Sequence, residues 1–440
     1  MLDRLFRLRE NHTDVRRELV AGLTTFAAMA YILAVNPQIL AGPNGATGMP
    51  PGAVLTATAL AAALTTIAMA VLTNYPIALA PGMGLNAFFT FGIVLGAGVP
   101  WQAALGLVFW EGLLFLLLSV SGIRRQIVDA IPHSLKIAIS CGIGLFIAFI
   151  GLKNGGLIVA DPNTFVKLGN LREPAVLIVL AGIIVTAVLI VRKVRGAIII
   201  VVFALTLAGI FISSGGKPLT SLPGSPFGAP APLTTFLQLD LTYLFTHFNT
   251  ALPLVLTLLF VDLFDNLGTL IAVCKRAGLL DEKGNLPGIG RALAADAGAA
   301  MLGAVLGTST TTSYIESAAG VEEGGRTGLT GITVAGFFLA ALFLTPLILA
   351  IPAAATAPAL VIVGIFMMQG VREIDLADFA TAVPAVLTML MMPLSFSISE
   401  GIAIGFVAYV LLHLGLGRMK EVSVLAYILA ALFLLHFLTR

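Results

Sequence analysis

The chain alternates long apolar stretches with short polar ones. No Asp, Glu, Lys, Arg or His occurs between Leu19 and Trp110, and none occurs between Thr327 and Val371. A helix needs about 20 apolar residues to cross the hydrocarbon core of a bilayer, so the first stretch holds several such helices and the second at least two. A large soluble protein with buried helices could not leave stretches of this length without charge. The pattern predicts an all-α polytopic membrane protein.

Hydropathy predicts seven spans on each side of a Pro-rich polar stretch, which we expect to form a linker outside the membrane. The first set lies near residues 17–40, 52–74, 78–97, 101–120, 133–152, 174–193 and 196–213. The second set lies near residues 250–273, 290–307, 310–325, 328–350, 355–371, 376–394 and 396–414. A last apolar stretch, 422–438, is long enough for a short span or an interfacial helix.

The basic residues support this count. With the N-terminus inside and fourteen spans, the clusters that fall on the cytoplasmic side are the N-terminal arginines, Arg124/Arg125, Arg192/Lys193/Arg195, Lys275/Arg276/Lys283, Arg326, Arg372 and Arg418/Lys420. Cytoplasmic loops are enriched in Lys and Arg, so the sequence predicts a multi-pass protein of the cell membrane with a cytoplasmic N-terminus. A fifteenth span would place Arg440 outside, which favours a non-spanning helix over 422–438.

An odd number of spans in each half inverts the second half relative to the first, a common construction in transporters. We therefore expect inverted repeats at 1–213 and 250–440, joined by an extracytoplasmic linker at 214–249. The third span of each half is irregular. One reads NYPIALAPGMGLNAFFTFG and the other TSTTTSYIESAAGVEEGG. Broken helices are tolerated inside a membrane only where protein buries them or where they line a cavity, so both segments mark a candidate solute site.

Composition narrows the function. Charged residues make up 10% of the chain and the net charge is +2, without a basic patch for nucleic acid. The cysteines, Cys141 and Cys274, have no CxxC or metal-ligand spacing. No HExxH, P-loop or GxSxG pattern occurs, so the sequence predicts neither an enzyme nor a bound cofactor or metal. Without a nucleotide site, the energy for transport must come from an ion gradient or from the solute's own gradient.

Two aspartates carry the strongest chemical signal. Asp262 and Asp265 are three residues apart in an apolar helix, so they share one face. A carboxylate in mid-span costs about 2.5–3.5 kcal/mol on insertion scales and usually faces a cavity. We expect at least one of them to bind the solute and one to carry a proton. The alternative is a structural pair that caps neighbouring helix ends or bonds Ser and Thr.

Glu316 and Asn86 lie in the two irregular segments. Glu316 is a candidate ligand-facing acid, or otherwise an acid of an extramembrane loop. Asn86 can donate and accept at once, which suits a heterocycle, but a hydrogen bond between helices explains it equally well. Weaker candidates, for which packing, capping or solvated ion pairs are the favoured roles, are Glu111, Asp296, Glu322, Glu323, Arg326 and Glu400.

Five stretches carry a family likeness: RRELVAGLTTFAAMAYILAVNPQIL, APGMGLNAFFTF, IPHSLKIAISCGIGLFIAFIGLKNGG, FVDLFDNLGTLIAV and GTSTTTSYIESAAGVEEGGRTGLT. They resemble the azaguanine-type purine permeases, the hypoxanthine/guanine/adenine branch of the nucleobase–cation symporter-2 (xanthine/uracil permease) family. The likeness extends from about Arg16 to at least Leu416.

This resemblance implies the fourteen-helix fold of the bacterial uracil permease. It implies a core domain, here 17–120 and 250–350, and a gate domain, here 133–213 and 355–414, with helices 3 and 10 broken by short strands. Substrate is then expected between the two domains.

The likeness also assigns the site residues. Asp265 in DNLGT matches the family's helix-8 acid, where Asp replaces Glu and Thr269 replaces the second His of the uracil and xanthine carriers. A shorter acid leaves more room for a bicyclic purine. Glu316 matches the helix-10 acid and Asn86 the polar residue of helix 3. Asp262 belongs to the helix-8 motif with a less defined role. Candidates to stack on a purine ring, with core packing as the alternative, are Phe88, Phe264 and Tyr314.

The sequence therefore predicts a secondary active transporter that imports purine nucleobases (adenine, guanine or hypoxanthine) by proton symport. The alternative is a carrier of anions or other small solutes with the same fold. The candidates for proton coupling are Asp262, Asp265 and Glu316. The expected partners are a purine base, protons and the lipid bilayer, with a homodimer compatible with this interpretation and nucleic acid excluded. Which purine is preferred, and whether protons or sodium ions drive transport, is left open.

Overall fold

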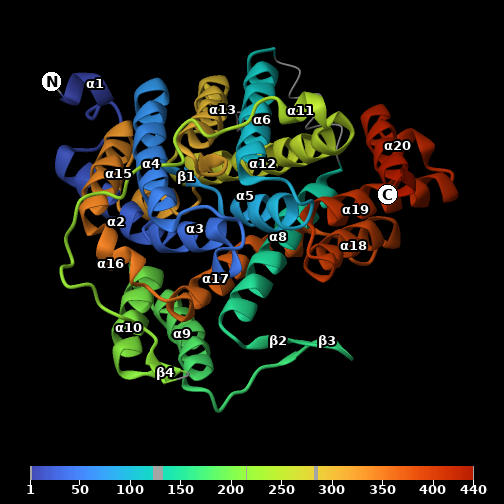
Figure 1. Cartoon of the computed structure of the whole chain (residues 1–440). Helices are drawn as coiled ribbons and strands as arrows, with labels where there is room; N and C mark the ends of the chain where they lie inside the picture. Colours follow the sequence, from blue (N-terminus) through green and yellow to red (C-terminus); the bar gives the residue numbers. More distant parts are fainter. Residues whose placement is uncertain (1, 122–131, 215, 282–285, 440) are drawn as a thin grey trace.

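The structure, a computed structural model, describes residues 2–121, 132–214, 216–281 and 286–439. Within them, ten helical segments are long and apolar enough to cross a membrane. They are α2 with α3 (Val15–Ala41), α4 (Pro51–Thr73), α6 (Trp101–Ser121), α8 (His133–Asn154), α9 (Pro174–Val191), α12 (Phe248–Arg276), α13 (Ile289–Leu306), α15 with α16 (Gly328–Leu349), α17 with its following turn (Ala353–Glu373) and α19 (Ile398–Gly415). Figure 1 shows the whole arrangement.

The remaining elements are shorter. The apolar ones are α5 with the π-helical turn after it (Met83–Val94), α10 (Ala197–Phe211) and α18 (Phe379–Ser395). The other helices are α1 (Leu2–Phe6), α11 (Tyr243–Thr246), α14 (Ser317–Glu322) and α20 (Val424–Thr439). The strands form three antiparallel pairs: β1 (Leu79–Pro81) with β6 (Thr311–Ser313), β2 (Ile158–Asp161) with β3 (Phe165–Leu168), and β4 (Ser213–Ser214) with β5 (Lys217–Pro218).

The polytopic helical architecture predicted from hydropathy is confirmed, and the segments at 78–97 and 310–325 are broken, as predicted. The count of fourteen crossings, the inverted repeat and the placement of 422–438 relative to the membrane stay predictions. One difference concerns the first span, which was predicted as a single helix over 17–40. It divides between Met29 and Ile32. Pro37 supplies no amide donor to α3, and the chain tightens one turn earlier, where Ala34 N donates to Tyr31 O.

The helices pack in two groups. In one, α13 packs on α6 and α4, and α15 packs on α4 and α2. In the other, α17 packs on α8, α9 and α10, and α18 packs on α8 and α19. Figure 1 shows α4, α13 and α6 beside each other at the top of the view and α9 beside α10 at the bottom. A glycine allows α14 to lie close against α2. A Cβ atom at Gly320 would overlap the Thr25 hydroxyl and the Ala21 carbonyl of α2.

The Pro-rich stretch between α10 and α11 follows the ends of the first group of helices. Its backbone amide at Asp240 donates to Gln102 O at 2.9 Å, and its carbonyl at Ala231 accepts from the Thr56 hydroxyl at 2.9 Å. The Trp110 indole donates to Leu241 O at 3.0 Å. In Figure 1 this yellow-green coil leaves α10 and reaches α11 on the opposite side of the molecule. The linker is therefore fastened to α4 and α6.

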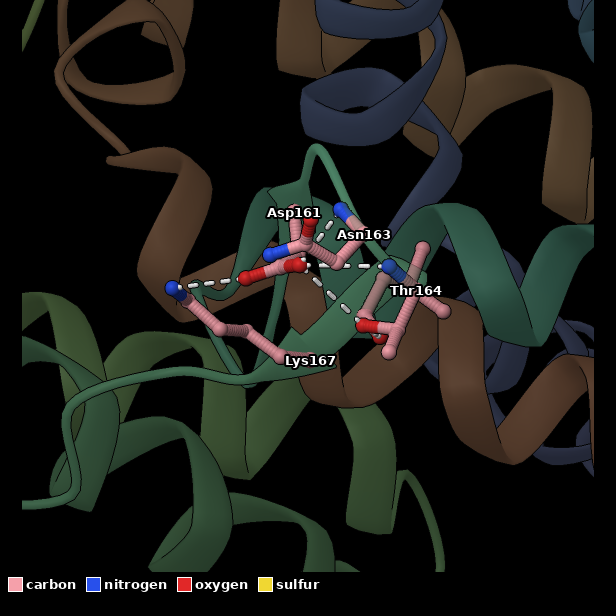
Figure 2. A network of polar contacts seen from close by, with 5 residues as sticks. Asp161, Asn163, Thr164 and Lys167 are labelled. Carbon is pink, nitrogen blue, oxygen red and sulfur yellow. Dashed lines mark hydrogen bonds and ion pairs between the residues drawn. The ribbon is translucent and has the colours of Figure 1, made fainter.

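A hairpin formed by β2 and β3 projects between α8 and α9 (Figure 1). At its turn the Asp161 carboxylate accepts the amides of Asn163 and Thr164 and pairs with Lys167 Nζ at 2.9 Å, as Figure 2 shows. Lys167, and then the two amides, hold the pKa of Asp161 below its usual value. A lowered pKa means that the contacts are present at neutral pH and are lost only as the pH falls through that value.

Candidate functional site

The two broken segments meet in one short ladder. β1 and β6 pair antiparallel, with Leu79 opposite Ser313 and Pro81 opposite Thr311. Backbone bonds extend the pairing at both ends, because Tyr314 N donates to Ala78 O at 2.9 Å and Gly82 N to Thr310 O at 3.0 Å. All six strand residues are buried. The ladder satisfies backbone groups that would otherwise be unpaired in the interior of a membrane protein. Helix α5 begins two residues after β1, and α14 begins four residues after β6.

A cavity of about 1560 Å³ lies between the two groups of helices. One wall is made by α12 and the start of α14, which contribute Asp265, Thr269 and Glu316. The other wall is made by α8, the α9–α10 connection and α17. The mouth of the cavity is rich in charge, with His133, Lys136, Lys193, Arg195, Arg276, Glu322 and Glu323.

Three of the residues predicted from the sequence thus come together. Asp265 and Glu316 are each partly exposed, and Thr269 lies one turn beyond Asp265 on α12 with 8% of its surface exposed. Glu316 immediately precedes α14. The carboxyls approach the same cavity from two helices, and a polar solute with more than one N–H group can bridge such an arrangement.

Tyr31 belongs to this site and was missed in the sequence. Its hydroxyl donates to Glu316 Oε1 at 2.8 Å, and its side chain is buried. The residue sits at the division between α2 and α3, so its hydroxyl reaches the start of α14. The only sequence signal was a polar tip in an uncharged stretch, six residues before Pro37. Tyr31 orients the Glu316 carboxyl.

Four other predicted residues are buried and do not line the cavity. Asn86 Oδ1 accepts the Ser309 hydroxyl, and its Nδ2 donates to Pro81 O at 3.4 Å, so its contacts are with the two broken segments and not with another helix. The Tyr314 hydroxyl also donates to Pro81 O, at 2.5 Å. Phe88 and Asp262 are fully buried. The Phe264 side chain lies outside the described residues. A direct role in binding for any of these stays a prediction.

Several of the weaker candidates have structural partners. Arg276 pairs with Glu322 at 2.7 Å, and Arg195 pairs with Glu323 at 2.5 Å. The second ion pair joins α14 to the α9–α10 connection, across the cavity mouth. Glu400 lies in the first turn of α19, whose N-cap is Ser397. The remaining acids, Glu111 and Asp296, are fully buried.

Apolar spanning helices, two broken segments joined in one buried ladder and an acid-lined cavity between two helix groups are the features of a multi-pass membrane transporter. Residues 16–404 match the xanthine/uracil permeases, described as the Permease family. The chain belongs to this family, as the resemblance indicated.

Its relatives cover nearly the whole sequence. It is 43% identical to the adenine permease AdeP of Escherichia coli, over 99% of this chain and 95% of that protein. It is 46% identical to the guanine/hypoxanthine permease PbuG of Bacillus subtilis, over 98% of each. Among solved structures it shares the fold of the transmembrane domain of the cyanobacterial bicarbonate transporter BicA, with a TM-score of 0.61 and 15% identity over 88% of this chain and 96% of that one.

Proposed function

We propose that this protein is a secondary active transporter that imports purine nucleobases by proton symport. The observation that carries the proposal is that Asp265 and Glu316 line one cavity from two different helices. The names of the relatives, which include adenine and guanine/hypoxanthine permeases, support a purine as the solute.

The chemistry of the cavity suits a neutral heterocycle. A purine presents ring N–H groups, which ionised carboxylates accept through charge-assisted hydrogen bonds. Asp265 and Glu316 supply these acceptors, and the Thr269 hydroxyl can donate to a ring nitrogen or carbonyl oxygen. An inorganic anion, the alternative solute, would meet two carboxyls. The apolar residues of α17 on the opposite wall, Val363, Phe366 and Met367, offer a surface for the face of the ring.

Transport requires the two helix groups to move relative to one another. The group with α4, α6, α12, α13 and α15 corresponds to the core domain, and the group with α8, α9, α10, α17, α18 and α19 to the gate domain. The mouth of the cavity carries the basic residues that the charge pattern assigns to the cytoplasm. This conformation therefore opens inward. The Arg195–Glu323 ion pair connects core to gate and has to break during the cycle.

The same proposal places the protein in a lipid bilayer. Helices α9 and α10 expose apolar side chains, such as Ile184, Val188 and Leu207, which we assign to contact with lipid. The cell membrane, with the N-terminus in the cytoplasm, is the proposed location. A homodimer is compatible with it.

The decisive experiment is uptake of radiolabelled adenine, guanine and hypoxanthine into proteoliposomes with an imposed proton gradient. One proton crossing 100 mV releases about 2.3 kcal/mol, which supports roughly fifty-fold accumulation. We expect accumulation of at least one purine that an uncoupler abolishes, with no accumulation in liposomes that lack the protein. Bicarbonate flux without purine uptake would contradict the proposal, as would accumulation that follows a sodium gradient alone.

Tyr31→Phe is expected to raise the KM for the purine about two- to tenfold, with a smaller change in the maximal rate. The substitution removes a hydrogen bond worth about 0.5–1.5 kcal/mol and frees the Glu316 carboxyl to rotate. Initial rates of uptake over a range of purine concentrations measure it. Tyr75→Phe is the matched control, since that hydroxyl donates to the Pro287 carbonyl and neither residue lines the cavity. Equal KM values for the two variants would show that Tyr31 does not contribute to purine binding.

A further inference from the structure

Three carboxyls lie together behind the cavity wall. They are Glu111 on α6, Asp262 on α12 and Asp296 on α13, and each residue is fully buried. None of them lines the cavity. Their helices pack on one another, α6 against both α12 and α13. Three acids in the interior of a membrane protein need donors or cations, because an unpaired buried charge is costly.

Asp296 has its donors. Oδ1 accepts the backbone amide and the hydroxyl of Ser313, both at 2.9 Å, and Oδ2 accepts the Thr312 hydroxyl at 3.3 Å. These donors belong to β6, so Asp296 fixes that strand of the broken segment. Its hydrogen bonds explain Asp296 as a structural acid.

Glu111 and Asp262 have no such partners. All four of their carboxyl oxygens are buried without a conventional donor among the described residues. The two carboxyls instead lie close enough to interact with one another, on the packed helices α6 and α12. The Thr312 hydroxyl lies beside Asp262, but its single proton is given to Asp296. Two carboxyls placed in this way can be joined only by a proton that one of them carries.

The ion pairs described in the structure include neither residue, and the described residues form no acidic cluster able to hold a metal ion. Neighbouring elements α4, α5, α11 and β6 carry no Asp, Glu, Lys, Arg or His. Acidic, basic and other titratable side chains also occur on α12 and on the further elements packed against α6 and α12. They are Asp265, Cys274, Lys275 and Arg276 of α12, Arg291 and Asp296 of α13, Glu316 and Glu322 at either end of α14, His133, Lys136, Cys141 and Lys153 of α8, Tyr243 of α11, and Glu400, Tyr409 and His413 of α19. Asp296 and Asp265 are the ones that interact with Asp262, and both are acids.

We propose that Glu111 and Asp262 form a buried proton-binding pair that shares one proton, and that this proton is the one coupled to solute movement. Two structural links carry the coupling. Asp262 lies one helical turn before Asp265, which lines the cavity. Thr312, beside Asp262, lies on β6, four residues before Glu316. Loss of the proton leaves two facing charges without a cation, so the helices and β6 have to rearrange. The coupling part of this proposal rests on the proposed function.

Glu111→Gln separates coupling from binding, because glutamine imitates a permanently protonated acid and lies outside the cavity. In proteoliposomes, we expect the Glu111→Gln variant to exchange external for internal purine at a rate within about threefold of that of the unmodified protein. Accumulation driven by a proton gradient should fall from roughly fifty-fold to about onefold, since no proton crosses with the solute. Asp262→Asn is the second variant and should lose accumulation in the same way. Glu421→Gln, an exposed acid after α19 that does not line the cavity, is the matched control and should keep it.

Infrared spectroscopy tests the proton itself without any transport. The purified protein at neutral pH should show the carbonyl band of a protonated carboxylic acid in a dry environment. Glu111→Gln should abolish or shift this band, and Glu421→Gln should leave it unchanged. A spectrum that Glu111→Gln does not alter, or undiminished proton-driven accumulation in that variant, would overturn the proposal. If the unmodified protein moves no purine, the proposed function fails, and the infrared band still decides whether the pair holds a proton.

Discussion

Replacing Glu316 with glutamine is expected to weaken purine binding by about ten- to hundredfold. A hydrogen bond to a charged group contributes about 1.5–3 kcal/mol, and the glutamine NH2 group would meet an N–H of the base with another donor. The Tyr31 hydroxyl can still donate to the remaining amide oxygen, so the side chain keeps its place. Asp265→Asn should have an effect of the same order, because Asp265 faces the same cavity from α12.

Equilibrium binding of radiolabelled purine to the purified protein measures this loss directly, and initial uptake rates measure it in vesicles. Glu322→Gln serves as the control, because it makes the same chemical change six residues away in an ion pair with Arg276 that is more than half exposed. Exposed ion pairs contribute about 0–1 kcal/mol, so we expect less than a fivefold change. Unchanged purine affinity in both Glu316→Gln and Asp265→Asn would show that these two acids do not bind the purine.

The second large effect concerns stability and centres on Glu18. This fully buried residue of α2 accepts the backbone amides of Arg326, Thr327 and Thr330 at 2.9, 3.3 and 3.1 Å, and the Thr330 hydroxyl at 2.6 Å. It thus holds a negative charge at the N-terminus of α15, where free amides and the helix dipole favour one. We expect Glu18→Gln to reduce the free energy of unfolding by about 2–4 kcal/mol, because the NH2 group leaves buried amides without an acceptor.

In thermal unfolding in detergent we expect the midpoint temperature to fall by about 2–4 °C, since the shift per kcal/mol decreases as the chain becomes longer. Glu10→Gln is the matched control, since Glu10 is exposed on the segment before α2, and its midpoint should not move. A Glu18→Gln protein as stable as the unmodified one would show that the amides at the start of α15 find other partners.

The sequence identified the broken segments because their departures from an apolar helix are local. Pro76, Pro81 and the following glycines interrupt one segment, and a run of Thr and Ser interrupts the other. The same reasoning singled out Asp265 and Glu316, since charge is conspicuous in an apolar stretch. Each of these features is recognisable in the local sequence, without knowledge of which helices contact one another.

The contacts that the sequence did not reveal depend on residues far apart in the chain. Tyr31 and Glu316 are separated by 285 positions, and Glu18 and Thr330 by 312. Glu18 lies at the start of the predicted first span, where the sequence alone gives it no role, and only the approach of α15 makes it a buried acceptor. Asn86 illustrates the converse case. Its amide suited a heterocycle and also a contact between helices, and its bond to Ser309 becomes visible only when the two broken segments are brought together.

The ladder between β1 and β6 also constrains the biogenesis of the protein. Leu79–Pro81 leaves the ribosome long before Thr311–Ser313. The Thr66 hydroxyl of α4 bonds the amide and the carbonyl of Leu79, but the other edge, which includes the Ala78 carbonyl and the Gly82 amide, is paired only when the later segment arrives. The first half of the chain can therefore insert into the membrane but cannot complete its own interior. Until synthesis has passed Ser313, the nascent chain holds an open strand edge within the bilayer, which water, lipid headgroups or a membrane-embedded chaperone has to cover.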